Sequence, residues 1–272
     1  MKQRKLFCEL SPFCYRLSTL KCCAVRRLRD CISGQKFARV RQQTLLPYSV
    51  CSHKSLMRRK LGNTDMQLQE NKVVNLSLAA PKVNGILIAP GEIFSFWHLV
   101  GACTAQRGYR EGLTITHGTP SQDIGGGMCQ FTNLIHWLVL HTPLTIVEHH
   151  HHDGRDLFPD FGRTTPFGVG TSVLYNYLDY RFANHADTTY QLMVHTDGTY
   201  LCGEMRAAQP LCVKYHISVE NERFVREGDA VFRESTVLRT CVDKTTGNVL
   251  CSECVRKNHA EVMYDTTGLS VE

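Results

Sequence analysis

The spacing of apolar residues changes along this chain, from a helical period near its start to the alternation and frequent turns typical of strands. Ser11 and Pro12 favour the start of a helix, and Gly34 favours its end. Between them, apolar side chains recur at helical spacing, with arginines in intervening positions: Phe13, Leu17, Leu20, Ala24 and Leu28. This pattern predicts an amphipathic helix. We expect its apolar stripe to pack on its own domain and its arginines to remain in water.

Farther along, residues 62–69 are polar and are expected to form a loop, and from Val73 onward the sequence has the character of strands and turns. Strands are predicted over residues 172–177, 180–182, 190–196, 200–205, 213–219 and 230–240, with Asp197 and Gly198 as a hairpin turn. The fold class that follows is α+β. A basic helical N-terminal region, residues 1–62, is expected to precede an α+β domain, residues 63–272, in which a mostly antiparallel sheet packs on a central buried helix.

The central helix is predicted from Gln130 to His141, a stretch that is dense in apolar residues and free of glycine and proline. A turn at Pro143 ends it, and residues 144–148 then favour a strand because most of them are β-branched. A helix of about twelve residues and a strand of six or seven residues both span roughly 20 Å. An antiparallel return therefore brings a run of four histidines, His149–His152, close to Cys129 at the start of the helix.

Cys129 is the candidate nucleophile. At the first turn of a helix, the positive end of the helix dipole stabilises a thiolate and lowers the pKa of the thiol, and a nearby imidazole would supply a general base. Alternate side chains of a strand face opposite sides, so His150 and His152 share one face and His149 and His151 share the other. The predicted base is His152, with His150 in its place if the strand register is shifted by two residues.

The candidate substrate-binding residues surround this thiol. The glycines let the backbone enter the helix tightly and keep side chains away from its first amides, which can then stabilise an oxyanion. The predicted set is Gly125, Gly126, Gly127, Gln130 and Asn133.

Two other interpretations of these residues stay open. Cys129 can be a small buried hydrophobe that follows a flexible glycine turn. A thiolate with two imidazoles is also an acceptable zinc site, whose ligands would be Cys129, His150 and His152, with Asp153 or Asp156 nearby. Because no Cys-x-x-Cys or His-x-x-x-His pair accompanies them at this point, we expect no metal cofactor.

Charge and cysteine content limit the cellular setting. Residues 1–60 hold 15 Lys or Arg against two acidic residues, whereas the whole chain has a net charge of +6. The basic amphipathic helix could therefore contact an anionic membrane surface, but no nucleic-acid-binding motif accompanies it. Thirteen cysteines, no apolar run of membrane-spanning length and no signal-peptide pattern lead us to expect a cytoplasmic protein with reduced thiols.

Several motifs together resemble the VanW family: Asn84-Gly85, Pro90-Gly91-Glu92-Ile93-Phe94-Ser95-Phe96, Arg107-Gly108-Tyr109-Arg110-Glu111-Gly112, the Gly-Gly-Gly-Met-Cys-Gln turn at 125–130 and the Val-Glu-His-His-His-His segment at 147–152. The similarity runs over nearly the whole chain, and the glycine-cysteine turn is its most specific part. The resemblance places the family's histidine at His152 and implies a role in bacterial cell-wall metabolism and vancomycin resistance, with no established reaction. Where the family commonly has an acidic residue, this chain has Gly170-Thr171, which weakens any catalytic set that needs an aspartate there.

Two functional hypotheses of different classes follow. The first is an accessory protein of glycopeptide (vancomycin) resistance that acts on a peptidoglycan precursor or stem peptide as a cysteine-dependent hydrolase or transpeptidase-like acyl transferase. Asn133 and Asp179 are candidates for a third catalytic group. The second is a non-catalytic binding or scaffold protein for wall precursors or resistance enzymes, in which the glycine turn holds an anionic group at the helix N-terminus.

Overall fold

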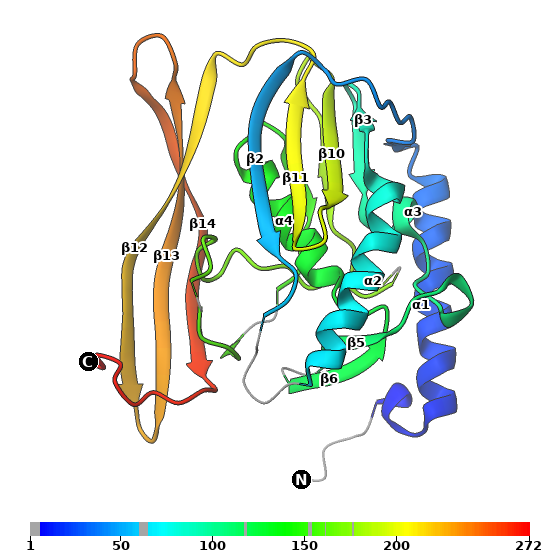
Figure 1. The fold of residues 1–272 in the computed structure, drawn as a ribbon, viewed down its shortest axis with the longest axis vertical. Helices are drawn as coiled ribbons and strands as arrows, with labels where there is room; N and C mark the ends of the chain where they lie inside the picture. The colour runs from blue at the N-terminus through cyan, green and yellow to red at the C-terminus, as the bar shows by residue number, and fades with distance from the viewer. Residues whose placement is uncertain (1–5, 60–64, 117–118, 152–153, 161, 176) are drawn as a thin grey trace.

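The N-terminal segment forms a long helix at one edge of the molecule, and a sheet of long strands lies at the opposite edge (Figure 1). The structure is a computed structural model and describes residues 6–59, 65–116, 119–151, 154–160, 162–175 and 177–272. After a 3-10 turn, η1 (Phe7–Glu9), helix α1 (Pro12–Ile32) begins at Ser11, whose hydroxyl accepts a hydrogen bond from the Cys14 amide at 3.1 Å. The predicted helix and its capping residue are confirmed.

The predicted packing of α1 is wrong. None of its residues is buried, and the apolar stripe is open to solvent, with Phe13 73%, Leu20 66% and Leu28 62% exposed. The opposite face of the helix attaches to the protein through charges: Arg26 pairs with Glu148, and Asp30 pairs with Arg181 at 2.7 Å. These ion pairs place the side of α1 that carries Arg26 and Asp30 against the protein. Phe13 and the leucines therefore face solvent.

Of the loop predicted at residues 62–69, residues 62–64 lie outside the described part of the chain, and residues 66–69 are helical instead. The strand-like character expected from Val73 onward is also wrong for residues 73–83. Helix α2 (Met66–Val83) begins at Asp65, whose carboxylate accepts the Gln67 amide at 2.9 Å. Its inner face is buried and carries apolar residues at helical spacing: Leu68, Leu76, Ala79 and Val83. Burial of this face outweighs the β propensity of Val73 and Val74.

Three sheets and a hairpin account for the strands of the described residues. The first sheet has the order β2-β11-β10-β3, with all neighbours antiparallel: β2 (Tyr48–Leu56), β11 (Tyr200–Ala207), β10 (Tyr190–Thr196) and β3 (Ile86–Ile88). The second has the order β1-β4-β9-β7, with only the first pair parallel: β1 (Lys36–Phe37), β4 (Glu92–Ser95), β9 (Arg181–Ala183) and β7 (Thr145–Glu148).

The third sheet has the order β12-β13-β14-β8 and is antiparallel except for the last pair: β12 (Val213–Glu227), β13 (Ala230–Asp243), β14 (Val249–Val262) and β8 (Arg155–Asp156). The hairpin pairs β5 (Glu111–Thr116) with β6 (Thr119–Ile124). Two short helices, α3 (Phe96–Val100) and η2 (Ala105–Arg107), connect β4 to β5. The α+β class is thus confirmed, and so is the largely antiparallel pairing.

Helix α4 (Met128–Leu140) is the buried central helix, as predicted. It packs against β2 and β11, where a Cβ added at Gly203 would lie only 2.8 Å from the Leu138 side chain. Strand β7 follows α4 as predicted, and β10 and β11 form the hairpin predicted at Asp197-Gly198. The first two strands belong to these same sheets, so residues 36–56 are part of the body of the fold, and the helical part of the predicted N-terminal region is residues 7–32.

The strand predicted at residues 172–177 does not form over 172–175 and 177, the positions of that range that are described. Its backbone bonds to other partners: the Ser172 amide donates to the carbonyl of His150 at 2.7 Å, and Leu174 forms an isolated bridge with Leu178. Strand β14, for which no prediction was made, completes the third sheet. Within the described ranges, no helix has both the length and the apolar character needed to span a bilayer.

Candidate functional site

Each glycine before α4 is in close contact with a different neighbour. A Cβ at Gly125 would collide with the side chain of Cys103, one at Gly126 with the backbone of Gly112, and one at Gly127 with the stem of Lys72. Gly125 and Gly127 also have φ values of +86° and +106°, which disfavour other residues. The turn therefore requires glycine both for its backbone conformation and for close packing.

Asn75, on α2, holds this turn in place. Its side-chain amide donates to the carbonyls of Gly126 and Arg110, each at 2.9 Å, and its carbonyl oxygen accepts the Arg110 amide at 2.8 Å. The side chain is fully buried. The sequence analysis did not single out Asn75, because residues near 73 were read as strand-like. The helical spacing of Leu68, Leu76 and Val83 is the signal that could have found it.

Cys129 does not have the lowered thiol pKa expected from the helix dipole. Burial raises the pKa of this thiol and outweighs the opposing effect of the backbone N–H groups of Val173 and Cys129 itself. The expectation considered the dipole alone, and within the described residues no cation contributes to the pKa of this thiol. Cys129 is therefore a neutral thiol whose sulfur accepts hydrogen bonds from backbone N–H groups.

The histidine run continues the alternation of β7, but the pair that faces α4 is His149 and His151. Their ring centroids lie 3.9 Å apart, and the His149 ring lies 4.2 Å from that of His136 on α4. His150 turns to the other side, where its Nε2 lies 3.0 Å from Glu148 Oε1. The predicted base His152 lies outside the described residues, so its role remains a prediction.

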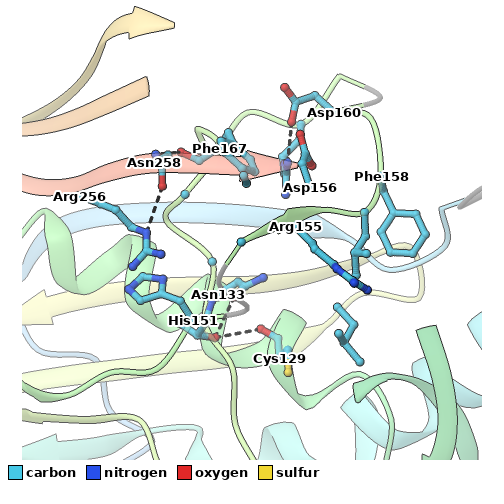
Figure 2. Close-up of a pocket in the computed structure, with 18 of the residues that line it drawn as sticks. Cys129, Asn133, His151, Arg155, Asp156, Phe158, Asp160, Phe167, Arg256 and Asn258 are labelled. Atoms are coloured by element: carbon cyan, nitrogen blue, oxygen red, sulfur yellow. Dashed lines mark hydrogen bonds and ion pairs between the residues drawn. The ribbon is translucent and has the colours of Figure 1, made fainter. Parts of the chain in front are cut away.

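Figure 2 shows the cavity that contains Cys129 and His151, here called the arginine cavity. Its volume is about 260 Å³, and its lining also includes Asn133, Arg59 and Arg163. The Cys129 sulfur and the His151 ring point away from each other in this view. Among the described residues, no imidazole is hydrogen bonded to the thiol. The cavity thus brings the two residue types together without forming a catalytic pair.

A second cavity, here called the lysine cavity, also has Cys129 in its wall and has a volume of about 420 Å³. Its wall includes the whole turn from Gly125 to Gln130 and the side chain of Lys72. Lys72 is only 7% exposed, and burial, together with the charge of Arg59, lowers the pKa of its amine to about 8. Cys129 therefore belongs to the walls of both cavities, and each wall also includes cationic residues.

Two of the predicted substrate-binding side chains also hold the fold together. The Gln130 amide donates to Ser55 Oγ and to the carbonyl of Leu56, both at 2.8 Å, which fixes α4 to β2. Asn133 Oδ1 accepts the amide and hydroxyl of Thr171, at 2.6 and 2.8 Å. Both residues line cavities, but the side-chain NH2 of Gln130 and the Oδ1 of Asn133 already have partners.

Comparison with known proteins places the chain in a family. The family model described as VanW like protein matches residues 71–206, half of the chain. The vancomycin B-type resistance protein VanW of Enterococcus faecalis is 33% identical over 263 residues, which cover 96% of this chain and 94% of that protein. The chain belongs to the VanW family. The resemblance of the glycine-cysteine turn and the other motifs is thereby confirmed.

A second relative matches a shorter part of the chain. The uncharacterized protein YoaR of Bacillus subtilis is 31% identical over 113 residues, 40% of this chain and 34% of that protein. No solved structure matches the chain. The matched residues 71–206 contain Lys72, Asn75 and Cys129, whereas strands β12, β13 and β14 lie beyond them.

The remaining residues predicted for the VanW site have other partners. Asp179, a candidate third catalytic group, is buried and accepts hydrogen bonds from the Trp97 amide at 3.1 Å and Arg181 Nε at 2.7 Å. It lines neither cavity. Asp156, considered beside the zinc alternative, pairs with Arg233 at 3.2 Å and accepts the Tyr264 hydroxyl at 3.0 Å.

The zinc alternative itself remains a prediction, because two of its residues, His152 and Asp153, lie outside the described part of the chain. Within the described part, the group of three potential ligands that comes together is Glu227, Glu234 and His259, on the third sheet. That group does not include Cys129.

Proposed function

We propose that this VanW-family protein acts in glycopeptide resistance by binding a peptidoglycan precursor or stem peptide in the two cavities that meet at Cys129. The observation that supports this proposal is the shared wall: Cys129, at the start of α4, lines both a cavity of about 260 Å³ and one of about 420 Å³. The resistance setting comes from the name of the Enterococcus relative.

The charge of the cavity walls supports an anionic ligand. In the arginine cavity, Arg163 pairs with Asp160 at 2.5 Å, but the guanidinium of Arg59 has no hydrogen-bond or ion-pair partner among the described residues. Burial and the charge of Arg163 lower the pKa of Arg59. In the lysine cavity, the ammonium of Lys72 is likewise without a partner. Stem peptides carry carboxylates, which can neutralise such cations.

Cysteine-dependent hydrolysis or acyl transfer is the second candidate, and the position of Cys129 between the two cavities favours it. In such a step the thiolate attacks an acyl carbon, the amide bond breaks, and the leaving nitrogen takes the proton from a histidine; water or an amine then releases the acyl group. Because burial raises the pKa of the free thiol, ligand binding would have to bring an imidazole to the sulfur.

Cys129→Ser separates the two candidates. Binding of a stem peptide is measured by calorimetry, and vancomycin resistance is measured in cells that depend on this protein, with Cys31→Ser as the control at an exposed cysteine. Retained binding with retained resistance supports the binding function. Retained binding with lost resistance supports chemistry at the thiol, and absence of binding to the wild-type protein contradicts both.

Alkylation of the ligand-free protein tests the state of the thiol directly. We expect Cys129 to react with iodoacetamide at neutral pH more slowly than the exposed Cys31, because its raised pKa leaves less thiolate. A faster reaction at Cys129 would contradict the binding function in favour of an activated nucleophile.

We further propose that α1 lies on an anionic membrane surface and that the protein works on the cytoplasmic side. The exposed stripe Phe13, Leu17, Leu20 and Leu28 is flanked by Arg16, Arg27 and Arg29, the composition of an interfacial helix. All thirteen cysteines are free thiols, as expected in a reducing compartment.

Vesicle sedimentation tests this contact. The wild-type protein should bind vesicles containing phosphatidylglycerol more strongly than vesicles of phosphatidylcholine alone, and the double variant Leu20→Ser, Leu28→Ser should lose that binding. Leu250→Ser provides a matched control, because this leucine is 57% exposed on β14. Equal binding by the double variant, or equal binding to both vesicle types, would contradict the proposal.

A further inference from the structure

Lys72 is a buried cation that the protein itself does not neutralise. Its side chain is 7% exposed, and among the described residues its ammonium has neither an ion-pair nor a hydrogen-bond partner. The positive charge of Arg59 makes protonation of the Lys72 amine still less favourable. An isolated buried ammonium is costly, and Lys72 belongs to the wall of a cavity that can admit a counter-charge.

The start of α4 adds hydrogen-bond donors to the same cavity. Gly127 is the N-cap residue and has no side chain to accept the first amides of the helix, and no acidic residue occupies the first turn. The N–H groups of Gly127 and Met128 have no acceptor among the described residues. Gly127 also makes room for Lys72, whose stem occupies the place where a Cβ would be. Lys72 of α2 and the first residues of α4 thus belong to the wall of one cavity.

The rest of the cavity wall is mainly apolar and includes Trp97, Leu113 and Val173. One carboxylate, that of Asp123, also belongs to the wall, and its Oδ1 accepts the Ile124 amide at 2.7 Å. One ammonium and two backbone N–H groups can neutralise and hydrogen bond a single carboxylate on a ligand that is otherwise apolar. A diphosphate would bring more negative charge than these groups can neutralise.

We propose that the lysine cavity holds a free carboxylate of the ligand between the ammonium of Lys72 and the N–H groups of Gly127 and Met128. This inference rests on the proposed function and narrows it: the ligand is a peptide that enters with its C-terminal carboxylate on the Lys72 side of Cys129. The remainder of the peptide then lies across the thiol, toward the arginine cavity.

The first test compares a stem peptide that has a free C-terminal carboxylate with the same peptide as its C-terminal carboxamide, by calorimetry. The wild-type protein should bind the carboxylate form about tenfold more tightly or better, and Lys72→Met should bind both forms alike. Lys244→Met, at an exposed lysine, should behave as wild type. Equal affinity of the wild-type protein for both peptides would overturn the carboxylate site and leave the proposed function standing.

A second test does not depend on the peptide. Acetate and inorganic phosphate are compared with chloride at equal ionic strength for their effect on the unfolding temperature. Acetate should stabilise the wild-type protein and Lys244→Met but not Lys72→Met, because only a protein with the site gains binding free energy. Equal stabilisation of Lys72→Met overturns the inference, and a stronger effect of phosphate than of acetate overturns the assignment to a carboxylate. If acetate acts as expected and neither peptide binds, the proposed function fails while the anion site stands.

Discussion

Two clusters of buried charge in this protein differ in how their charges are neutralised. Between α1 and the second sheet, Arg181 pairs with Asp30 and Asp179, each at 2.7 Å, and Arg26 pairs with Glu148. Lys72, on α2 beside the start of α4, is about as deeply buried as Arg181. It has no carboxylate partner among the described residues. The first cluster fixes a helix to a sheet. The second keeps its charge available to whatever enters the cavity.

The pKa values of Arg181 and Lys72 are shifted in opposite directions, because the charges around the two side chains have opposite signs. Buried carboxylates raise the pKa of Arg181, although burial alone would lower it, whereas burial lowers that of Lys72 to about 8 because only a like charge is near. Removal of the Arg181 charge should therefore lower the stability of the protein, whereas removal of the Lys72 charge should raise it.

The largest effect is expected at the paired cluster. Arg181→Met leaves Asp30 and Asp179 buried without their cation and should reduce the free energy of unfolding by about 3–5 kcal/mol. Urea denaturation measures this loss. Arg223→Met is the control, because Arg223 and its partners Glu234 and Glu272 lie at the surface and should contribute little. A loss at Arg181 no greater than in the control would show that the cluster does not fix α1.

Lys72→Met should have the opposite sign. The folded protein holds the amine at a pKa of about 8, whereas the unfolded value is 10.5, so below pH 8 the buried ammonium costs about 3 kcal/mol that the variant recovers. Between about pH 8 and 10.5 the unfolded chain binds a proton that the folded chain has released. The stability of the wild-type protein should therefore rise toward that of Lys72→Met as the pH rises through this window.

Denaturation of the two proteins across this pH range measures the convergence. If Lys72→Met is less stable than wild type at neutral pH, Lys72 has a neutralising partner, and the contrast with Arg181 fails.

The smallest effect concerns the glycine turn that places α4 beside Lys72. At Gly126→Ala the new Cβ would collide with the backbone of Gly112, so we expect a loss of at least about 1 kcal/mol. Gly170→Ala is the matched control, since its nearest neighbour would be Asn133 Oδ1 at 4.0 Å and its φ is not positive. Equal stability of the two variants, measured by thermal unfolding, would mean that the turn can relax without cost.

Local periodicity predicted those elements whose packing follows their own pattern. The run from Phe131 to Leu140 is buried as the sequence indicates, and β7 and β10 follow from their β-branched and alternating residues. The same reasoning failed at α1, because an apolar stripe shows that a helix has two faces and not which face meets the protein. Only the long-range pairs of Arg26 and Asp30 decide that question.

The candidate site shows the same limit. The return of the histidines toward Cys129 could be predicted, because it depends on the lengths of one helix and one strand. Which alternate pair faces α4 depends on contacts of the His149 ring with His136 on α4 and with Tyr180, which lies about thirty residues farther along the chain. The raised pKa of Cys129 depends on how deeply the folded protein buries its thiol, and Lys72 reaches the turn from a helix that begins more than fifty residues earlier. No local pattern contains that information.

The most direct test of the account is a titration of ¹⁵N-labelled protein with a stem peptide that has a free C-terminal carboxylate, followed through the backbone amide resonances. The account predicts that the Gly127 and Met128 resonances move downfield and saturate with one affinity, and that these shifts disappear in Lys72→Met. Saturable binding that leaves both amides unmoved, or that moves them equally in Lys72→Met, would contradict it.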